Sequence, residues 1–304
     1  MTVDIDTALV LARWLNFVSL AILLGASLLR FYAAPWWRAF MSRDAAAGRV
    51  IAVFGYLALA SGLAWVARSL MVMGDGFAAL FDPQTIGAFL LETSFGPVWM
   101  IRIALLIAIA VIAGATGMGK GSPPRYGELA CLAGLALAAQ AWIGHAAMVL
   151  GTRRIVEMTS YIVHVLCVGA WIGGLWSLTR LLAYSQTGKI DLERYRDLLR
   201  RFSNLGMVVV LLILASGVAN TLFRLRSRSD LLSTNYGWVI LGKVGLFALM
   251  LALASWNRWR LMPRLALGEG VALVGLRQKA LIELALGILV LGLAALLGTL
   301  APGI

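Results

Sequence analysis

Two histidines, His145 and His164, are the residues of this 304-residue chain best suited to carry chemistry. His145 lies near the end of one long apolar segment, and His164 lies just inside the start of the next. An ionisable side chain is costly in hydrocarbon, so one that is retained there usually ligates a metal, moves a proton or holds a haem. Adjacent helix axes lie about 8–10 Å apart, so two facing imidazoles at matched depth could share one ion.

Sulfur side chains accompany the two histidines. Cys167 follows His164 by three residues and so lies on nearly the same helix face. Met148 follows His145, and Met73 ends an earlier apolar segment. Imidazole with thioether or thiolate suits copper, above all Cu(I), and suits magnesium or calcium poorly. We therefore predict a site for Cu(I) or Cu(II) formed by His145 and His164, with Met148, Met73 and Cys167 as candidate sulfur ligands.

The elements that must position these residues are membrane helices. The chain is 61% hydrophobic and only 13% charged, with a mean hydropathy of +0.89, which predicts an all-α integral membrane protein. Most cations behind the net charge of +12 lie in loops between apolar segments, where they contact lipid headgroups, so nucleic-acid binding is not expected. No nucleophile, base and acid are arranged as in an enzyme, and both cysteines fall within spans, so no disulfide framework is expected.

At roughly 20 apolar residues per crossing, the sequence predicts eight membrane spans. The first apolar run, which begins near Leu9, is too long for the core of a signal peptide and is expected to be retained. The predicted spans are Leu9–Ala34, Ile51–Val72, Val98–Thr116, Leu129–Leu150, Ser160–Leu182, Leu205–Leu222, Trp238–Trp256 and Ala280–Leu300. Gly151–Thr159 is then a short connection, and the charged segment Ile190–Phe202 is either an interfacial helix or an extension of the next span.

Loop charge predicts the orientation. The odd-numbered connections and their flanks carry 17 Lys or Arg, and the even-numbered ones carry five. Because cations accumulate on the cytoplasmic side, both termini are predicted to face away from the cytoplasm, which in a bacterium means the periplasm.

The two halves of the chain share short patterns in the same order. Thr93-Ser94-Phe95-Gly96 is followed by Arg102, and Thr234-Asn235-Tyr236-Gly237 is followed by Lys243 at the same spacing. Leu59–Gly62 (LASG) likewise matches Leu214–Gly217, and Asn16 with Gly25 matches His164 with Gly173. Four spans per half predict a parallel repeat of residues 1–156 and 157–304, related by a pseudo-two-fold axis along the membrane normal. Arg102 and Lys243 then lie at equivalent depths, as interior contacts or as side chains that reach the headgroups.

The run from His164 to Leu175 (HVLCVGAWIGGL) resembles the histidine-to-WxGGL segment of the CopD family of bacterial copper-resistance membrane proteins. Further matching pieces follow in order along nearly the whole chain: Gly144-His145-Ala146-Ala147, Thr93–Gly96 with Trp99 and Arg102, Arg201-Phe202-Ser203, Tyr236-Gly237 with Lys243, and Asn257-Arg258 with Pro263. The resemblance implies a multi-pass inner-membrane protein that moves copper from periplasm to cytoplasm beside a periplasmic CopC-type partner. Here that partner would be a separate protein.

One departure from the family pattern concerns the metal ligands. Family members often carry a further histidine in the first helix, where this chain has Asn16. The resemblance therefore leaves His145, His164 and sulfur side chains as the expected metal ligands. Two other functions stay open: a haem b electron carrier with the histidines as axial ligands, and a membrane scaffold or sensor whose histidines are only structural.

Overall fold

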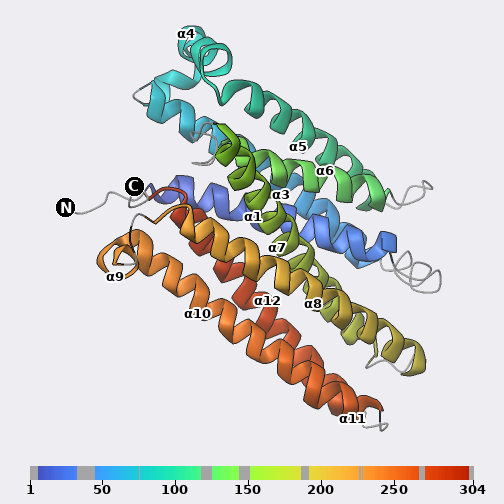
Figure 1. Ribbon diagram of the computed structural model, residues 1–304. Coiled ribbons are helices and arrows are strands. Elements are labelled where there is room, and N and C mark those ends of the chain that lie inside the picture. The colour runs from blue at the N-terminus through green and yellow to red at the C-terminus, as the bar shows by residue number, and fades with distance from the viewer. Residues whose placement is uncertain are drawn as a thin grey trace.

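The computed structural model describes residues 6–32, 45–74, 76–117, 125–143, 151–185, 192–225, 227, 229–266 and 271–300, and no strand occurs in these ranges (Figure 1). Seven of the described helices are long and apolar enough to cross a membrane. They are α1 (Thr7–Tyr32), α3 (Ala45–Met73), α5 (Gly96–Gly117), α7 (Gly151–Ser185), α8 (Leu192–Leu222), α10 (Asn235–Trp256) and α12 (Val271–Leu297).

The fourth predicted span, Leu129–Leu150, is described only in part. Its first portion forms α6 (Tyr126–Ala138) and one 3-10 turn, η3 (Ala139–Trp142), and residues 144–150 lie outside the described ranges. α6 packs against α1, α5 and α7 along the bundle. Seven of the eight predicted spans are therefore found as long helices, and the eighth stays a prediction.

Several helices begin earlier than their apolar runs. The expectation of a connection at Gly151–Thr159 is wrong, because α7 begins at Gly151 and its first turns carry an Arg153–Glu157 ion pair (2.7 Å) at i,i+4. Of the two predictions for the segment Ile190–Phe202, the helix extension is confirmed, since α8 runs without a break from Leu192 to Leu222. Hydropathy marks where a helix meets hydrocarbon, whereas charged helix formers continue it beyond that point.

The start of α1 and the end of α12 lie at one end of the bundle, called here the proximal end (Figure 1). Arg13 near the start of α1 donates from Nη1 to the carbonyl oxygen of Gly298, just past α12 (3.0 Å). Six of the short described elements connect or extend the long helices: η1 (Phe77–Leu80), α4 (Pro83–Gly87), η2 (Ala88–Glu92), α9 (Asp230–Ser233), η5 (Asn257–Leu261) and α11 (Met262–Ala266). All of these except η5 and α11 lie at the proximal end.

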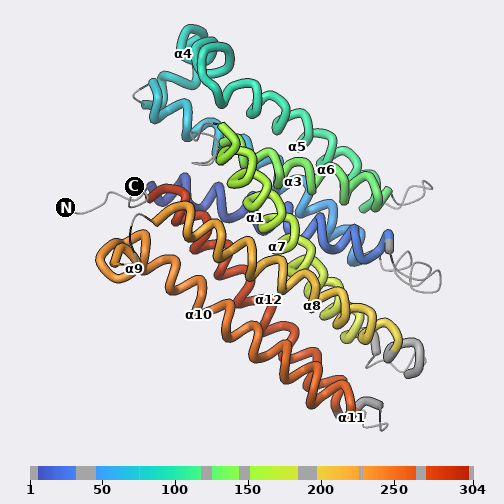
Figure 2. Tube along the Cα trace, in the orientation of Figure 1, coloured from blue at the N-terminus to red at the C-terminus, as the bar shows by residue number. Residues whose placement is uncertain are grey.

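Two groups of helices lie side by side in the bundle (Figure 2). One holds α1, α3, α5 and α6, and the other holds α7, α8, α10 and α12, with α1 packed against both α7 and α12. α1 and α7 touch backbone to backbone at two glycines. A Cβ on Gly25 would lie 2.6 Å from the Gly174 nitrogen, and one on Gly173 would lie 2.3 Å from the Ala21 oxygen. Only glycine permits this approach, which brings the two helices of the predicted repeat into direct contact.

The matched sequence patterns adopt matched local structures. The Thr93 hydroxyl accepts from the Gly96 amide (3.1 Å) at the start of α5, and the Thr234 hydroxyl accepts from the Gly237 amide (2.9 Å) at the start of α10. Each threonine thereby satisfies a free amide of a helix N-terminus. This similarity is what an internal duplication predicts, and the duplication itself stays a prediction.

Candidate functional site

His164 is held by a serine on the neighbouring helix. Its Nδ1 lies 3.0 Å from Oγ of Ser216, and this hydroxyl donates to the carbonyl of Leu212 (2.5 Å). A hydroxyl has a single proton, so a serine that donates to Leu212 can only accept from the imidazole. This arrangement favours the tautomer with the proton on Nδ1, which leaves the Nε2 lone pair available to a metal.

A glycine makes room for this imidazole. A Cβ on Gly217 would lie 3.3 Å from Cε1 of His164, closer than ordinary van der Waals contact. The Ser216-Gly217 pair on α8 therefore supplies both the hydrogen bond and the space that fix the ring.

His164 lines a cavity of about 230 Å³ between the two groups of helices, called here the His164 cavity. Its wall comes from α1, α3 and η3 on one side and from α7, α10 and α12 on the other. Besides His164, its larger polar lining residues are Arg13, Gln140, Tyr161, Arg224, Tyr236 and Lys243.

Trp65 is one of the aromatic residues in this wall. The Arg13 guanidinium lies 4.8 Å from the Trp65 ring centroid, and the Arg102 guanidinium lies 5.4 Å from it. Trp65 also packs edge-on against Trp99, with ring centroids 5.2 Å apart. Cation–π contact of this kind stabilises a guanidinium away from water.

The other predicted ligands are not gathered around His164 in the part of the chain that the structure describes. His145 and Met148 lie outside the described residues. Met73, at the end of α3, is 45% exposed and is not part of the cavity wall. Cys167, one turn after His164, packs against the central apolar cluster instead of lining the cavity. Among the described residues, no three His, Cys, Asp or Glu side chains cluster as a metal site would require, so the ligand set stays a prediction.

The first helix group contains a cluster in the positions matching His164. Asn16 donates from Nδ2 to the carbonyl of Ala58 (2.9 Å), and its Oδ1 accepts from Nη2 of Arg102 (3.0 Å). Nη1 of Arg102 donates to the carbonyl of Ala136 (2.5 Å). Ser61, the match of Ser216, lies 3.4 Å from the Asn16 amide. Asn16 and Arg102 are both 0% exposed, so this cluster is sealed inside the protein.

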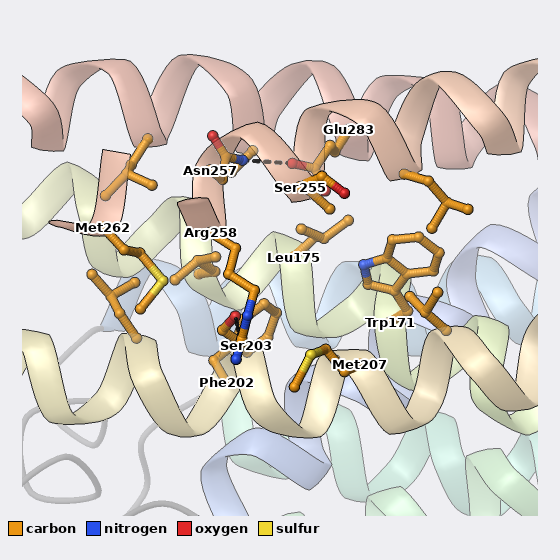
Figure 3. A pocket seen from close by; sticks show the side chains of 18 of the residues that line it. Trp171, Leu175, Phe202, Ser203, Met207, Ser255, Asn257, Arg258, Met262 and Glu283 are labelled. Atoms are coloured by element: carbon orange, nitrogen blue, oxygen red, sulfur yellow. Dashed lines mark hydrogen bonds between the residues drawn. The ribbon is translucent and has the colours of Figure 1, made fainter. Parts of the chain in front are cut away.

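A second cavity of about 220 Å³ lies within the other helix group, toward the end of the bundle opposite the proximal end. Figure 3 shows it between Trp171 and Met262, with Glu283 of α12 at its edge. Glu283 is 2% exposed and accepts a hydrogen bond on Oε1 from Nδ2 of Asn257 (2.7 Å). Asn257 opens η5, a π-helical turn, and such turns are frequent at functional sites.

Glu283 is not among the residues predicted from the sequence, although the sequence contains a signal for it. A carboxylate inside the predicted span Ala280–Leu300 is as unusual in hydrocarbon as the histidines are. The cation that lines this cavity, Arg258, is turned toward α8, where it donates to Ser203 Oγ (2.5 Å) and Asn204 Oδ1 (3.2 Å). In the described residues Glu283 has no ion-pair partner, and its only hydrogen-bond donor is Asn257.

The bundle and its histidine-lined cavity define a multi-pass helical membrane protein with a polar site between two helix groups. Residues 4–155 match the family model described as "Copper resistance protein D-like, N-terminal domain", and residues 196–297 match the one described as "Copper resistance protein D". The chain belongs to the copper resistance protein D family, and it is a copper-related protein of the inner membrane.

Three relatives illustrate this membership. "Copper resistance protein D" of Pseudomonas syringae pv. tomato is 36% identical over 69% of this chain and 70% of the relative. "Inner membrane protein YebZ" of Escherichia coli K12 is 29% identical over 95% of this chain and 97% of the relative. "Copper transport protein CutJ" of Bacillus subtilis 168 is 34% identical over 60% of this chain, which corresponds to 34% of that relative. No solved structure matches the chain.

Proposed function

We propose that the protein takes up copper at the proximal face of the bundle and delivers it across the inner membrane. The observation that carries this proposal is the setting of His164. Its Nδ1 is anchored to Ser216, and the ring lines a cavity shared by the two helix groups. A ligand whose other nitrogen is fixed by a hydrogen bond is typical of metal-binding histidines. His145 is the proposed second imidazole ligand, with Met148, Met73 and Cys167 as sulfur candidates.

The loop charges support uptake from the periplasm. The connections and helix ends opposite the proximal end carry 17 of the 22 cations counted in connections and their flanks, which fits a cytoplasmic location for that end. The proximal end, where α1 begins and α12 ends, is then periplasmic. A separate CopC-type periplasmic protein is the proposed donor, and the lipid bilayer surrounds the bundle.

α7 is the proposed route from the His164 cavity to the second cavity, which contains Glu283. Tyr161, His164, Val165, Val168 and Gly169 of this helix line the His164 cavity, and Trp171, Leu175, Leu178 and Leu182 line the second cavity. Trp171 packs edge-on against Phe247 of α10 with ring centroids 5.7 Å apart. Passage inward would follow this face of α7 from the interface of the two halves into the second half, driven by a gradient or by handover to a cytoplasmic acceptor.

Elemental analysis tests the proposal directly. Copper and iron would be measured together on the detergent-purified protein after copper loading, in the wild type and in the His145→Ala/His164→Ala variant. These are the only histidines in the chain, so the double variant removes every imidazole. We expect about one copper per chain in the wild type and none in a variant that still elutes as a folded species. Unchanged copper in the variant would contradict the site, iron without copper would indicate haem, and neither metal would indicate structural histidines.

A further inference from the structure

The polar wall of the His164 cavity is rich in hydrogen-bond donors and poor in acceptors. Arg13, Arg224 and Lys243 line it from three different segments of the chain, together with the hydroxyls of Tyr161 and Tyr236. No Asp or Glu lines it in the part of the chain that the structure describes. Three cations that share one low-dielectric cavity repel each other and any metal cation that enters, unless negative charge is brought in with it.

Two donors at this wall have no partner. Gln140 is 4% exposed, and its Oε1 accepts a weak hydrogen bond from the Tyr161 hydroxyl (3.4 Å), yet its Nε2 has no acceptor. The Nε of Arg13 is also buried without an acceptor. Buried donors are nearly always satisfied in proteins, so two unsatisfied ones beside a cavity indicate an acceptor that is supplied from outside.

Two carboxylates on helices that line the cavity or next to them are engaged in ion pairs. Asp6 pairs with Arg68 (2.6 Å), and Glu157 pairs with Arg153 (2.7 Å), and neither carboxylate belongs to the cavity wall. Lys243 has no hydrogen-bond or ion-pair partner among the described residues. The excess of donors is therefore a property of the cavity itself.

We infer that the His164 cavity binds a small anion with acceptor oxygens, such as a carboxylate or phosphate, held by Lys243, Arg13 and the amide of Gln140. The anion neutralises part of the cationic wall and fills the two free donor positions. Beside His164 it also lowers the repulsion on an entering copper ion, so anion and copper bind cooperatively. This coupling rests on the proposed function, whereas the anion site itself rests only on the cations and unpaired donors that line the cavity.

Anion binding is tested without copper. The purified full chain in detergent would be titrated with sodium formate and, separately, with sodium phosphate at constant ionic strength set by sodium chloride, whose anion has no acceptor oxygens. Tryptophan fluorescence would report the apparent Tm. A ligand that binds only the folded protein raises Tm with the logarithm of its concentration above Kd, and we expect a rise of about 2–3 °C at a tenfold excess over Kd. No rise in Tm with either anion, relative to the ionic-strength control, overturns the inference.

Matched variants locate the effect. Lys243→Met on α10 and Gln140→Met on η3 are each expected to weaken anion binding at least about tenfold, as the loss of a charged or buried hydrogen bond implies. Lys243→Arg keeps the charge and is expected to retain binding. Arg260→Gln is the control, because Arg260 is exposed, stacks on Trp256 and is absent from the cavity wall. Equal anion affinity in Lys243→Met, Gln140→Met and wild type overturns the site, and either variant alone suffices if the other does not fold.

Two further experiments test whether the anion is a free ion or a lipid phosphate, and whether the anion and copper bind cooperatively. Stabilisation by phosphatidylglycerol micelles but by neither small anion would show that a lipid phosphate occupies the wall and would overturn a free anion as ligand. For the coupling, copper affinity would be measured with and without saturating formate, and an increase of about tenfold is expected. Anion binding in a protein that binds no copper would refute the proposed function and leave the anion site supported.

Discussion

The Asn16 cluster and the His164 cluster occupy matching positions in the sequence patterns of the two helix groups, but the first is buried and the second lines a cavity. In the first, Asn16 is joined to Ser61 and Arg102, and the cluster is closed to any ligand. In the second, His164 is joined to Ser216, and both His164 and Lys243 line an open cavity. Arg102 donates to Asn16, whereas Lys243, at the matching place in the second sequence pattern, has no bonding partner among the described residues.

If His164 binds copper as proposed, the matched sequence patterns hold a structural cluster in one helix group and a ligand site in the other. The serine on the neighbouring helix is the shared part, since Ser61 and Ser216 each bond back to their own helix, at Leu57 (2.6 Å) and Leu212 (2.5 Å). The two clusters differ in what contacts the amide or imidazole. Asn16 contacts the guanidinium of Arg102, so its cluster can only stabilise the fold, whereas His164 faces a cavity that a ligand can enter.

Replacing Arg102 should have the largest effect on folding. Arg102→Met leaves Asn16 Oδ1 and the Ala136 carbonyl without their donor. Loss of the charged donor to a buried acceptor lowers stability by about 1.5–3 kcal/mol. Because two acceptors are affected, we expect the free energy of unfolding to fall by about 3 kcal/mol or more. Unfolding in detergent with increasing SDS would measure it. Lys243→Met, at the matching position, should change stability by less than about 1 kcal/mol, and equal losses in the two variants would refute the contrast.

Replacing His164 by the residue at the matching position should separate function from fold. His164→Asn supplies an amide of the kind that Asn16 carries, so the helix packing should survive while copper affinity falls about 100-fold or more. Copper affinity by competition with a chelator, together with thermal unfolding, would measure the two effects. Asn16→Ala is the paired control, expected to lose stability and keep copper affinity. If Asn16→Ala lost copper affinity and His164→Asn kept it, the copper site would lie in the first helix group and the present assignment would be wrong.

The two serines sharpen the same comparison at smaller scale. Ser216→Ala removes the acceptor that holds the His164 Nδ1 proton, so copper affinity should fall about tenfold through loss of ring orientation. Ser61→Ala should leave copper affinity unchanged, because Asn16 keeps its bonds to Ala58 and Arg102. Metal titration of both variants would test this. A larger copper defect in Ser61→Ala than in Ser216→Ala would contradict the assignment.

Hydropathy and short motifs predicted much of this molecule. The helical class and seven of the eight predicted spans follow from side-chain chemistry that the sequence displays directly, whereas the role of His164, which lines a cavity, stays a prediction. The start of α7 at Gly151 could not be found in this way, because Arg153 and Glu157 are polar but helix-forming. The cationic wall was equally hidden, since Arg13, Gln140 and Arg224 meet at one cavity only after helices distant in sequence pack together.

The smallest expected effect concerns Glu283 in the second cavity. Glu283→Gln keeps an acceptor for Nδ2 of Asn257, so stability should change by less than about 0.5 kcal/mol. Glu283→Ala leaves that donor buried and unpaired and should cost about 1–3 kcal/mol. Thermal unfolding of the two variants would measure the difference. Equal destabilisation by glutamine and alanine would show that the Asn257 hydrogen bond is not what holds this part of the bundle.

The central claim, that copper binds the imidazole of the His164 cluster, is tested most directly by X-ray absorption at the copper K-edge of the loaded protein. Imidazole ligands give outer-shell scattering that sulfur and simple oxygen ligands lack. We predict scattering from two imidazoles in the wild type and from one in a copper-loaded His164→Asn variant at high protein concentration. A wild-type spectrum without imidazole scattering, or one that the His164→Asn variant reproduces unchanged, would contradict the account.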